Sequence, residues 1–259
     1  MGIINVTPDS FYDGGETTHK DSILQQAEKM LSEGATFLDV GGYSSRPNAI
    51  AIPEEEEISR VVPAIKSILD EFPETLISID TFRSQVAKKA VEAGACLVND
   101  ISGGSLDEAM FTTVAKMQVP YVLMHMRGTP QTMTQQTDYN DITIEVIRFF
   151  SGQIAKARLA GINDIIIDPG FGFAKTKEQS FELLQKVELL KQLDAPILAG
   201  ISRKSMIYKT LNISAKEALN GTTVLNTLAL QKGTSILRVH DVKEAVECIK
   251  LTEMLTPYL

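Results

Sequence analysis

The chain alternates short apolar runs with amphipathic segments along its whole length. The apolar runs are typical of β-strands and the amphipathic segments of α-helices. About eight such strand–helix units follow one another at a mean period of roughly 30 residues, which matches the count in a (β/α)8 barrel. The sequence therefore predicts an α/β chain folded as a TIM barrel. The expected strands are residues 2–6, 36–40, 76–80, 96–100, 120–124, 165–168, 197–201 and 236–239.

The expected strands are apolar throughout, as in a parallel sheet that is buried on both faces. The rival architecture is an open, doubly wound sheet, which usually has fewer strands and a glycine-rich dinucleotide loop after the first. No G-x-G-x-x-G pattern opens a helix in this chain. Since α/β barrels of 259 residues are routinely single domains and no low-complexity linker interrupts the chain, we expect one domain over residues 1–259.

Bulk composition excludes several classes of partner. A net charge of −8 and a pI near 5.0 argue against a general nucleic-acid or anionic-membrane surface. The chain shows no secretory signal pattern and no apolar run long enough to span a membrane. Cys96 and Cys248 lie in apolar runs without metal or redox spacing and are expected to be reduced core thiols. We therefore expect a cytoplasmic location and neither nucleic-acid nor membrane partners.

A doubly basic turn follows the expected strand 197–201. Ser202, Arg203 and Lys204 precede a helix, and two cations at a helix start oppose the helix dipole. A solvated turn is one explanation, and an anionic or electron-rich ligand above the turn is the other. In a (β/α)8 barrel, the second explanation agrees with the usual place of the active site, at the C-terminal ends of the strands.

Polar side chains stand at most of the other expected strand ends. Helix capping is the structural alternative for such residues and fits Asp107 and Asp241 well. It fits Asp80, Asn99 and Asp168 less well, since apolar strand residues precede each of them and they are expected to face the barrel mouth. The full set of strand-end positions is Asn5, Asp39, Asp80, Asn99, Asp100, His125, Asp168, Ser202, Arg203, Lys204, Arg238 and His240.

These positions suggest a ligand with two chemically different ends. Carboxylates accept paired N–H bonds from an aminopyrimidine-like ring, while Asn and Lys can satisfy its oxygen and ring nitrogens. Arg suits a bidentate grip on phosphate, and Asn5 could also be an oxygen ligand to Mg²⁺ carried by a pyrophosphate. The heterocycle set is Asp80, Asn99, Asp168 and Lys204, and the anion set is Asn5, Arg238 and His240.

Two further groups of residues are interpreted as structural. His125 stands between two Met residues and is expected to have a structural role. The run Glu54 to Glu57 is expected to favour the first turn of a helix through its dipole and to form a solvated face, not a metal site.

The chain resembles the dihydropteroate synthase family over nearly its whole length. The motifs that carry the resemblance occur in family order, about one at each expected strand end, and their joint occurrence is specific. They are G-I-I-N-V-T-P-D-S-F (2–11) with D-G-G (13–15), D-V-G-G (39–42) with S-R-P (45–47), S-I-D-T (78–81), V-N-D (98–100), L-M-H-M (123–126), D-P-G-F-G-F (168–173), S-R-K-S-M (202–206) and R-V-H-D (238–241).

The resemblance implies a (β/α)8 homodimer that joins p-aminobenzoate to 6-hydroxymethyl-7,8-dihydropterin pyrophosphate, with Mg²⁺ as cofactor. It implies a reaction through a pterin cation, catalysed by Asp80, Lys204, Arg46 and Asp13, with Asp13 and Arg46 on loops that close over the site. By the same resemblance, Asp80, Asn99, Asp168, Lys204, Met124 and Phe173 contact the pterin; Asn5, Arg238 and His240 hold pyrophosphate and metal; and Phe11, Ser45, Arg46, Pro47 and Ser202 frame the p-aminobenzoate pocket.

The chain departs from the family pattern in three places. Tyr43 stands where family members usually carry Glu, and Ser45 where they often carry Thr. Both changes put the affinity for p-aminobenzoate and the sensitivity to sulfonamides in question. The family also commonly has an N-terminal hairpin before the first strand, whereas Met1 directly precedes that strand here.

Two other functions remain open. The first is a methyltetrahydrofolate–corrinoid methyltransferase, which shares the pterin-pocket residues but has no need of the loop with Arg46 and Pro47 or of a pyrophosphate set. Methyl transfer without pyrophosphate release would favour it. The second is a non-catalytic pterin-binding paralogue, which would bind pterin without turnover; it would be expected to carry damaged signature loops, and those of this chain are mostly intact.

Overall fold

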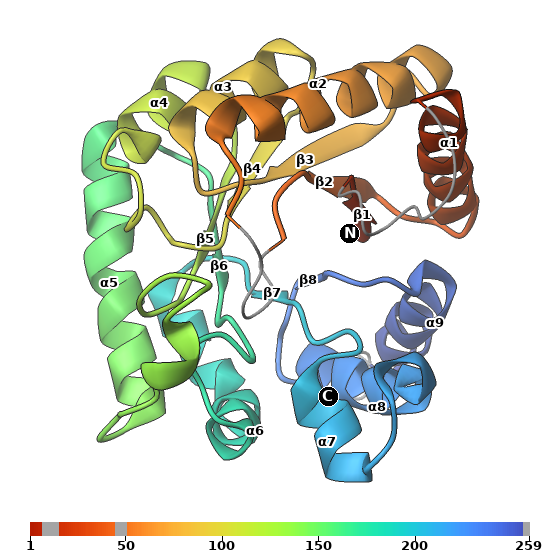
Figure 1. Cartoon of the computed structure of the whole chain (residues 1–259). Coiled ribbons are helices and arrows are strands. Elements are labelled where there is room, and N and C mark those ends of the chain that lie inside the picture. Colours follow the sequence, from red (N-terminus) through yellow and green to blue (C-terminus); the bar gives the residue numbers. More distant parts are fainter. Residues whose placement is uncertain (7–15, 45–50, 256–259) are drawn as a thin grey trace.

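The chain forms a closed barrel of parallel strands, as the sequence predicts. The computed structural model describes residues 1–6, 16–44 and 51–255. Six strands form one parallel sheet in sequence order, and β7 and β8 form a second parallel pair. Bridges between Gly2 and Val239 and between Ile167 and Ile197 join the two sheets on both sides, which closes the ring (Figure 1). The strands are β1 (Gly2–Asn5), β2 (Phe37–Gly41), β3 (Leu76–Asp80), β4 (Leu97–Asp100), β5 (Tyr121–Met124), β6 (Ile165–Asp168), β7 (Leu198–Ala199) and β8 (Ile236–Leu237).

Helices surround the strands on the outside of the barrel (Figure 1). None of the helices in the described part of the chain is long and apolar enough to cross a membrane. The α-helices are α1 (Glu16–Ser32), α2 (Glu54–Glu71), α3 (Ser84–Glu92), α4 (Met110–Met117), α5 (Ile142–Ala160), α6 (Lys177–Gln185), α7 (Ser205–Leu211), α8 (Leu219–Gln231) and α9 (Val242–Glu253).

Two expected helices differ from the observed ones. The apolar periodicity of residues 177–193 predicts one helix, whereas the structure has α6 followed by a 3₁₀ segment, Val187–Leu193. Val187 and Leu190 are its buried residues, and their three-residue spacing suits the three residues per turn of a 3₁₀ helix. The sequence predicts a second helix over about 106–117, but this helix begins at Met110, because the Asp107 carboxylate accepts the backbone N–H groups of Ser84 and Ala109.

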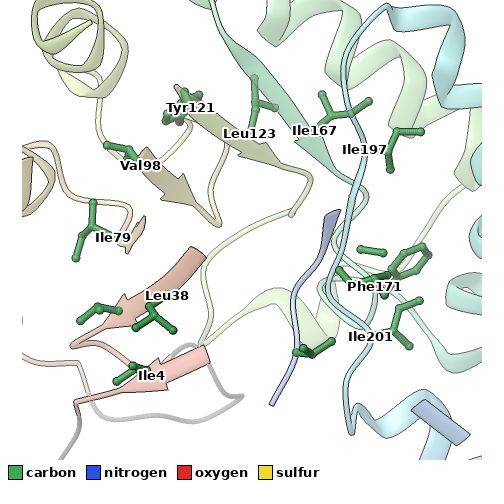
Figure 2. Close-up of a cluster of buried hydrophobic side chains, with 14 of the residues drawn as sticks. Ile4, Leu38, Ile79, Val98, Tyr121, Leu123, Ile167, Phe171, Ile197 and Ile201 are labelled. Carbon is green, nitrogen blue, oxygen red and sulfur yellow. The ribbon is translucent and has the colours of Figure 1, made fainter. Parts of the chain in front are cut away.

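Side chains along each strand alternate between the helices and the barrel interior, with the two-residue period of a β-strand. Ile4, Leu38, Ile79, Leu123 and Ile167 are fully buried and belong to the large core cluster that includes side chains of the surrounding helices (Figure 2). The interior has its own small apolar cluster, formed by Leu97, Val122 and Leu198. One step further toward the C-terminal strand ends, the interior positions become polar: Asp39, Asp80, Asn99, Asp168 and Arg238. This alternation places a polar layer at the barrel mouth.

Candidate active site

The guanidinium of Arg238 lies at the centre of this polar layer. Its Nε donates to Oδ2 of Asp39 at 2.6 Å, and its Nη2 donates to Oδ2 of Asp80 at 2.6 Å. The amide Nδ2 of Asn99 donates to the same Asp39 oxygen at 3.0 Å. Residues from β2, β3 and β4 and the residue that follows β8 therefore form one hydrogen-bonded array.

The array changes the acidity of its members. Burial raises the pKa of the Asp80 carboxyl to about 7, with a further rise from the Asp39 carboxylate, although the Arg238 cation acts in the opposite direction. Burial lowers the pKa of Arg238, but Asp39 and Asp80 outweigh burial, so its pKa is raised overall. Arg238 is therefore a permanent cation, whereas Asp80 titrates near neutral pH.

A second polar group faces this array from β6 and the turn after β7. Lys204 donates from Nζ to the carbonyl oxygen of Phe171 at 2.7 Å, and the same nitrogen lies 4.7 Å from the ring centroid of Phe173. Asp168 accepts the backbone N–H of Gly170 through Oδ1 at 2.7 Å. Burial lowers the pKa of Lys204 to about 8, against the attraction of the Asp168 carboxylate. Burial raises the pKa of Asp168, opposed by the Lys204 cation.

The backbone makes room for the lysine at Gly200. A Cβ atom at this position would lie 3.7 Å from Nζ of Lys204 and 3.8 Å from Oδ2 of Asp168. Gly200 thus faces the same space as these two charged groups. A larger side chain there would enter that space.

An apolar wall borders the polar layer. Met124, at the end of β5, is buried in a cluster with Ile101, Met126, Met133 and Ala174, and the partly buried Phe173 packs against this cluster. An aromatic ring and a thioether beside hydrogen-bonding groups are well suited to a flat heterocycle. The structure thus places Met124 and Phe173, which the family resemblance assigns to the pterin pocket, at the same apolar cluster.

The three residues of the basic turn after β7 make different contacts. Ser202 Oγ lies 3.0 Å from Nδ1 of His240 and also accepts the His240 backbone N–H at 3.2 Å. Arg203 adopts a positive φ of 53° and turns away, donating from Nε and Nη2 to both carboxylate oxygens of Asp241 at 2.8 Å. Arg203 therefore stabilises the barrel rim. Lys204 is the residue of the turn that reaches the polar layer.

Two structural expectations are wrong. Asp241 makes no side-chain cap to α9 and pairs with Arg203 instead. Glu57 is fully buried, where the sequence interpretation places it on a solvated face. It accepts a hydrogen bond from the Thr81 hydroxyl at 2.7 Å and pairs with Arg83 at 2.8 Å. Glu54, Glu55 and Glu56 fit the expectation, with side chains intermediate or exposed in the first turn of α2.

Six further residues belong to the predicted site. Asn5 lies at the end of β1, beside Gly41 of β2. The remaining members lie outside the described residues, so their roles stay predictions: Phe11, Asp13, Ser45, Arg46 and Pro47.

Comparisons with known proteins identify the family of the chain. Residues 1–240 match the sequence model of a family described as "Pterin binding enzyme". A dihydropteroate synthase of Synechocystis sp. is 44% identical over 258 residues, covering 98% of this chain and 89% of the relative. The chain belongs to the dihydropteroate synthases, within the pterin-binding enzymes.

Solved structures extend the similarity to three dimensions. A dihydropteroate synthase from Clostridium difficile, obtained in the presence of pteroic acid, has a TM-score of 0.92 and 38% identity over 98% of this chain and 95% of that chain. The enzyme from Xanthomonas albilineans with 4-aminobenzoic acid has a TM-score of 0.91 and 38% identity over 98% of this chain and 92% of that chain. Both similarities span the barrel and its helices.

One member of the polar layer, Asp39, has a role that was not predicted from the sequence. Asp39 is among the strand-end positions, but its residue type and spacing assign it no role. The structure makes it the acceptor shared by Arg238 and Asn99, with no exposed surface and with its Oδ1 lacking a hydrogen-bond partner among the described residues. An aspartate between Leu38 and Val40, in an otherwise apolar strand, is the signal that could have revealed it.

Tyr43, which departs from the usual dihydropteroate synthase pattern, has a clear structural place. Its hydroxyl accepts a hydrogen bond from Nε2 of Gln131 at 2.8 Å, and its ring packs edge-on against Phe82 at 5.1 Å. The guanidinium carbon of Arg83 lies 5.2 Å from the ring centroid. Tyr43 thus connects the loops that follow β2, β3 and β5.

Proposed function

We propose that the polar layer of this dihydropteroate synthase binds the pterin substrate. The observation that supports it is the array Asp39–Arg238–Asp80–Asn99, which faces Lys204 and Asp168 and is bordered by Met124 and Phe173. Because an ionised carboxylate only accepts hydrogen bonds, the Asn99 amide must turn Nδ2 toward Asp39. The Oδ1 atom of Asn99 can then accept an N–H group of the heterocycle.

The enzyme joins 6-hydroxymethyl-7,8-dihydropterin pyrophosphate to p-aminobenzoate and releases 7,8-dihydropteroate and pyrophosphate. The bond between the pterin methylene carbon and the pyrophosphate oxygen breaks first, and its electron pair leaves with pyrophosphate. The guanidinium of Arg238 and the imidazole of His240 are proposed to stabilise the negative charge that develops on the leaving group. Arg238 already engages Asp39 and Asp80 through Nε and Nη2, so it lies between the pterin and pyrophosphate regions.

The remaining pterin cation needs negative charge nearby. Asp80 in its ionised form would supply this charge at the barrel mouth, while Lys204 donates hydrogen bonds to the ring. The aromatic face of Phe173 adds electron density on one side. The amine nitrogen of p-aminobenzoate then attacks the methylene carbon and loses a proton, without a covalent enzyme intermediate. Ser202 and residues 11 and 45–47 are proposed to frame the second substrate.

Mg²⁺ is proposed as the cofactor, carried by the pyrophosphate group. Within the described residues no cluster of three or more His, Cys, Asp or Glu side chains could hold a metal ion. The amide oxygen of Asn5 is a suitable ligand, because Mg²⁺ prefers oxygen and retains ligands from its substrate. When bound, the metal would neutralise charge on the leaving pyrophosphate.

The reaction is tested by measuring pyrophosphate release with each substrate omitted in turn. We expect release only when pterin pyrophosphate and p-aminobenzoate are both present. Asp80→Asn should abolish turnover while circular dichroism shows a folded protein. Asp70→Asn, on an exposed position of α2, is the matched control and should keep full activity.

Three outcomes would contradict the proposal. Near-normal turnover of Asp80→Asn would remove the assigned role of this carboxylate. Methyl transfer from methyltetrahydrofolate without pyrophosphate release would indicate the corrinoid methyltransferase alternative. Calorimetric binding of pterin without any turnover would indicate a non-catalytic paralogue.

A homodimer and a cytoplasmic location are proposed as well. Exposed apolar side chains on the last helices support an interface, namely Leu211 of α7, Val224 and Leu228 of α8 and Leu251 of α9. Ile249 of α9, by contrast, is partly buried and packs against the core. Light scattering after size-exclusion chromatography tests the dimer, and a monomer at micromolar concentration would contradict it. Cys248 is buried, whereas Cys96, which is expected to be a core thiol, is only partly buried.

A further inference from the structure

Lys175 has a buried side-chain amine that the reaction described above does not use. It follows the Gly170–Ala174 segment, and its side chain is 8% exposed. Its Nζ lies 2.8 Å from Nδ1 of His125 and donates to the carbonyl oxygens of Gly170 at 3.0 Å, Phe173 at 3.0 Å and His125 at 3.3 Å. Four acceptors thus surround one nitrogen, from the end of β5 and the loop after β6.

His125 is held so that it can accept this contact. Its ring packs edge-on against Phe149 at 4.9 Å and lies 6.1 Å from the Tyr139 ring. Burial lowers the pKa of Lys175 well below its usual range, opposed by the Asp168 carboxylate. Burial also lowers the pKa of His125, and the adjacent Lys175 lowers it further. A neutral imidazole with a free electron pair on Nδ1 is therefore the favoured form, which agrees with the expected structural role of His125.

The backbone of the loop curls around the Lys175 nitrogen. Gly170, Gly172 and Ala174 have positive φ values of 67°, 78° and 48°. Gly170 comes so close to β5 that a Cβ atom would lie 2.2 Å from the carbonyl oxygen of His125. These turns direct the carbonyls of Gly170 and Phe173 toward the Lys175 amine.

The same loop faces the candidate active site with its other carbonyl. Phe171 O accepts the hydrogen bond from Lys204, the Phe173 ring lies beside the same ammonium group, and the Gly170 N–H donates to Asp168. The loop is therefore held between two lysines. Lys175 binds its interior carbonyls, and Lys204 binds the carbonyl at the barrel mouth.

We propose that Lys175 is a positioning residue for the pterin half of the reaction, acting through residues 170–173 on Phe173, Lys204 and Asp168. This inference rests on the proposed pterin site. Without the Lys175 side-chain nitrogen, the carbonyls of Gly170 and Phe173 lose their N–H donor in a buried place. The loop would then shift or admit water, and the Phe173 ring and Lys204 ammonium would leave their present positions.

The test compares Lys175→Met with Lys177→Met. Methionine keeps most of the apolar side-chain length and removes the donor. Lys177 is two residues away on an exposed position, where it forms a salt bridge with the neighbouring Glu178, so it is the matched control. Two quantities are measured below the melting temperature of each variant: the Kd for 6-hydroxymethylpterin, by its fluorescence, and the KM for each substrate.

Lys175→Met is expected to weaken pterin binding by about 10-fold or more, whereas the KM for p-aminobenzoate changes by less than about 2-fold. Lys177→Met should change neither. A variant with a lower melting temperature but unchanged pterin affinity would overturn the proposal, because Lys175 would then only stabilise the fold. An equal loss for both substrates would overturn it as well.

A second variant covers the case in which Lys175→Met does not fold. Lys175→Gln keeps a hydrogen-bond donor on a shorter side chain, and the same selective loss of pterin affinity is expected, at a smaller size. Failure of the proposed function is a distinct result. Wild-type protein that binds the pterin but releases no pyrophosphate would refute the synthase reaction and still allow the Lys175 comparison, whereas wild-type protein that binds no pterin would refute both.

Discussion

Asp39 and Arg238 form an ion pair at the barrel mouth although 199 positions separate them in the chain. Asp39 lies on β2 and Arg238 directly follows β8, and closure of the barrel through the bridge between Gly2 and Val239 brings the two together. The carboxylate is fully buried and also accepts the Asn99 amide. The Asp39 carboxylate thus orients the side chains of Arg238 and Asn99, two residues that are assigned to ligand binding.

Asp39→Ala is expected to weaken both stability and catalysis. Removing one partner of a buried ion pair costs about 3–5 kcal/mol of unfolding free energy, and the second carboxylate, Asp80, reduces this loss to roughly 2–3 kcal/mol here. The ratio kcat/KM for the pterin substrate should fall by about 100-fold or more, because Arg238 and Asn99 lose their common anchor. Urea unfolding and the pyrophosphate assay measure the two effects. A variant as stable and as active as Asp70→Ala, an exposed control on α2, would contradict this expectation.

The pH dependence of kcat/KM should be bell-shaped with a narrow maximum. Asp80 acts as an anion, so the rate should rise as pH increases through its pKa of about 7. Lys204 acts as a protonated donor, so the rate should fall as pH increases through its pKa of about 8. Rates from about pH 5 to 10 at subsaturating pterin substrate test this. In Lys204→Arg the cation persists to high pH, so any remaining activity should lose its alkaline decline. A flat profile between about pH 6 and 9 would refute both assignments.

The buried Glu57 should contribute far more to stability than its exposed neighbour Glu55. Glu57→Gln removes a buried charge that pairs with Arg83 and accepts from Thr81, so we expect a loss of about 2–4 kcal/mol of unfolding free energy. Glu55→Gln, on the solvated face of α2, should change it by less than about 0.5 kcal/mol. Thermal and urea unfolding give the comparison, and equal effects of the two substitutions would contradict the structure.

Two glycines should respond in opposite directions to alanine. Gly170→Ala places a Cβ against the backbone of His125 at a positive φ, so we expect a loss of more than about 2 kcal/mol in stability and weaker pterin binding. Gly152 lies within α5 with nothing near its Cβ position, so Gly152→Ala should add about 0.5–1 kcal/mol. Unfolding curves of the two variants measure the changes in stability, and a pterin titration of each variant measures the change in binding. A tolerated Gly170→Ala would contradict the tight path of the loop.

The architecture could be predicted because it depends on local patterns. Apolar runs of strand length alternate with helical periodicity, and most strands end in a polar residue, so the barrel and its mouth follow from the order of residues. For the same reason Asp80, Asn99, Asp168 and Lys204 could be grouped from their positions in the sequence. Helix boundaries follow less directly from the sequence, since Asp107 and the buried pair Val187 and Leu190 decide them through contacts with other elements.

The partners of the polar side chains could not be predicted in the same way. Four consecutive glutamates look alike in the sequence, yet Glu57 alone among them is buried, because α2 turns that position toward Thr81 and Arg83 of the β3–α3 connection. Arg238 could be assigned to an anion, but its two carboxylate partners come from β2 and β3 and meet it only when the barrel closes. Lys175 gives no sequence signal at all.

The sequence by itself therefore determined the (β/α)8 barrel, its family and the polar composition of the strand ends, since these depend on periodicity and on residue order. Only the tertiary structure decided which charges are paired, which carboxyl has a pKa raised by burial and which lysine binds the carbonyls of the loop after β6. Burial and hydrogen bonding set these properties, and both arise from contacts between segments that are far apart in the chain.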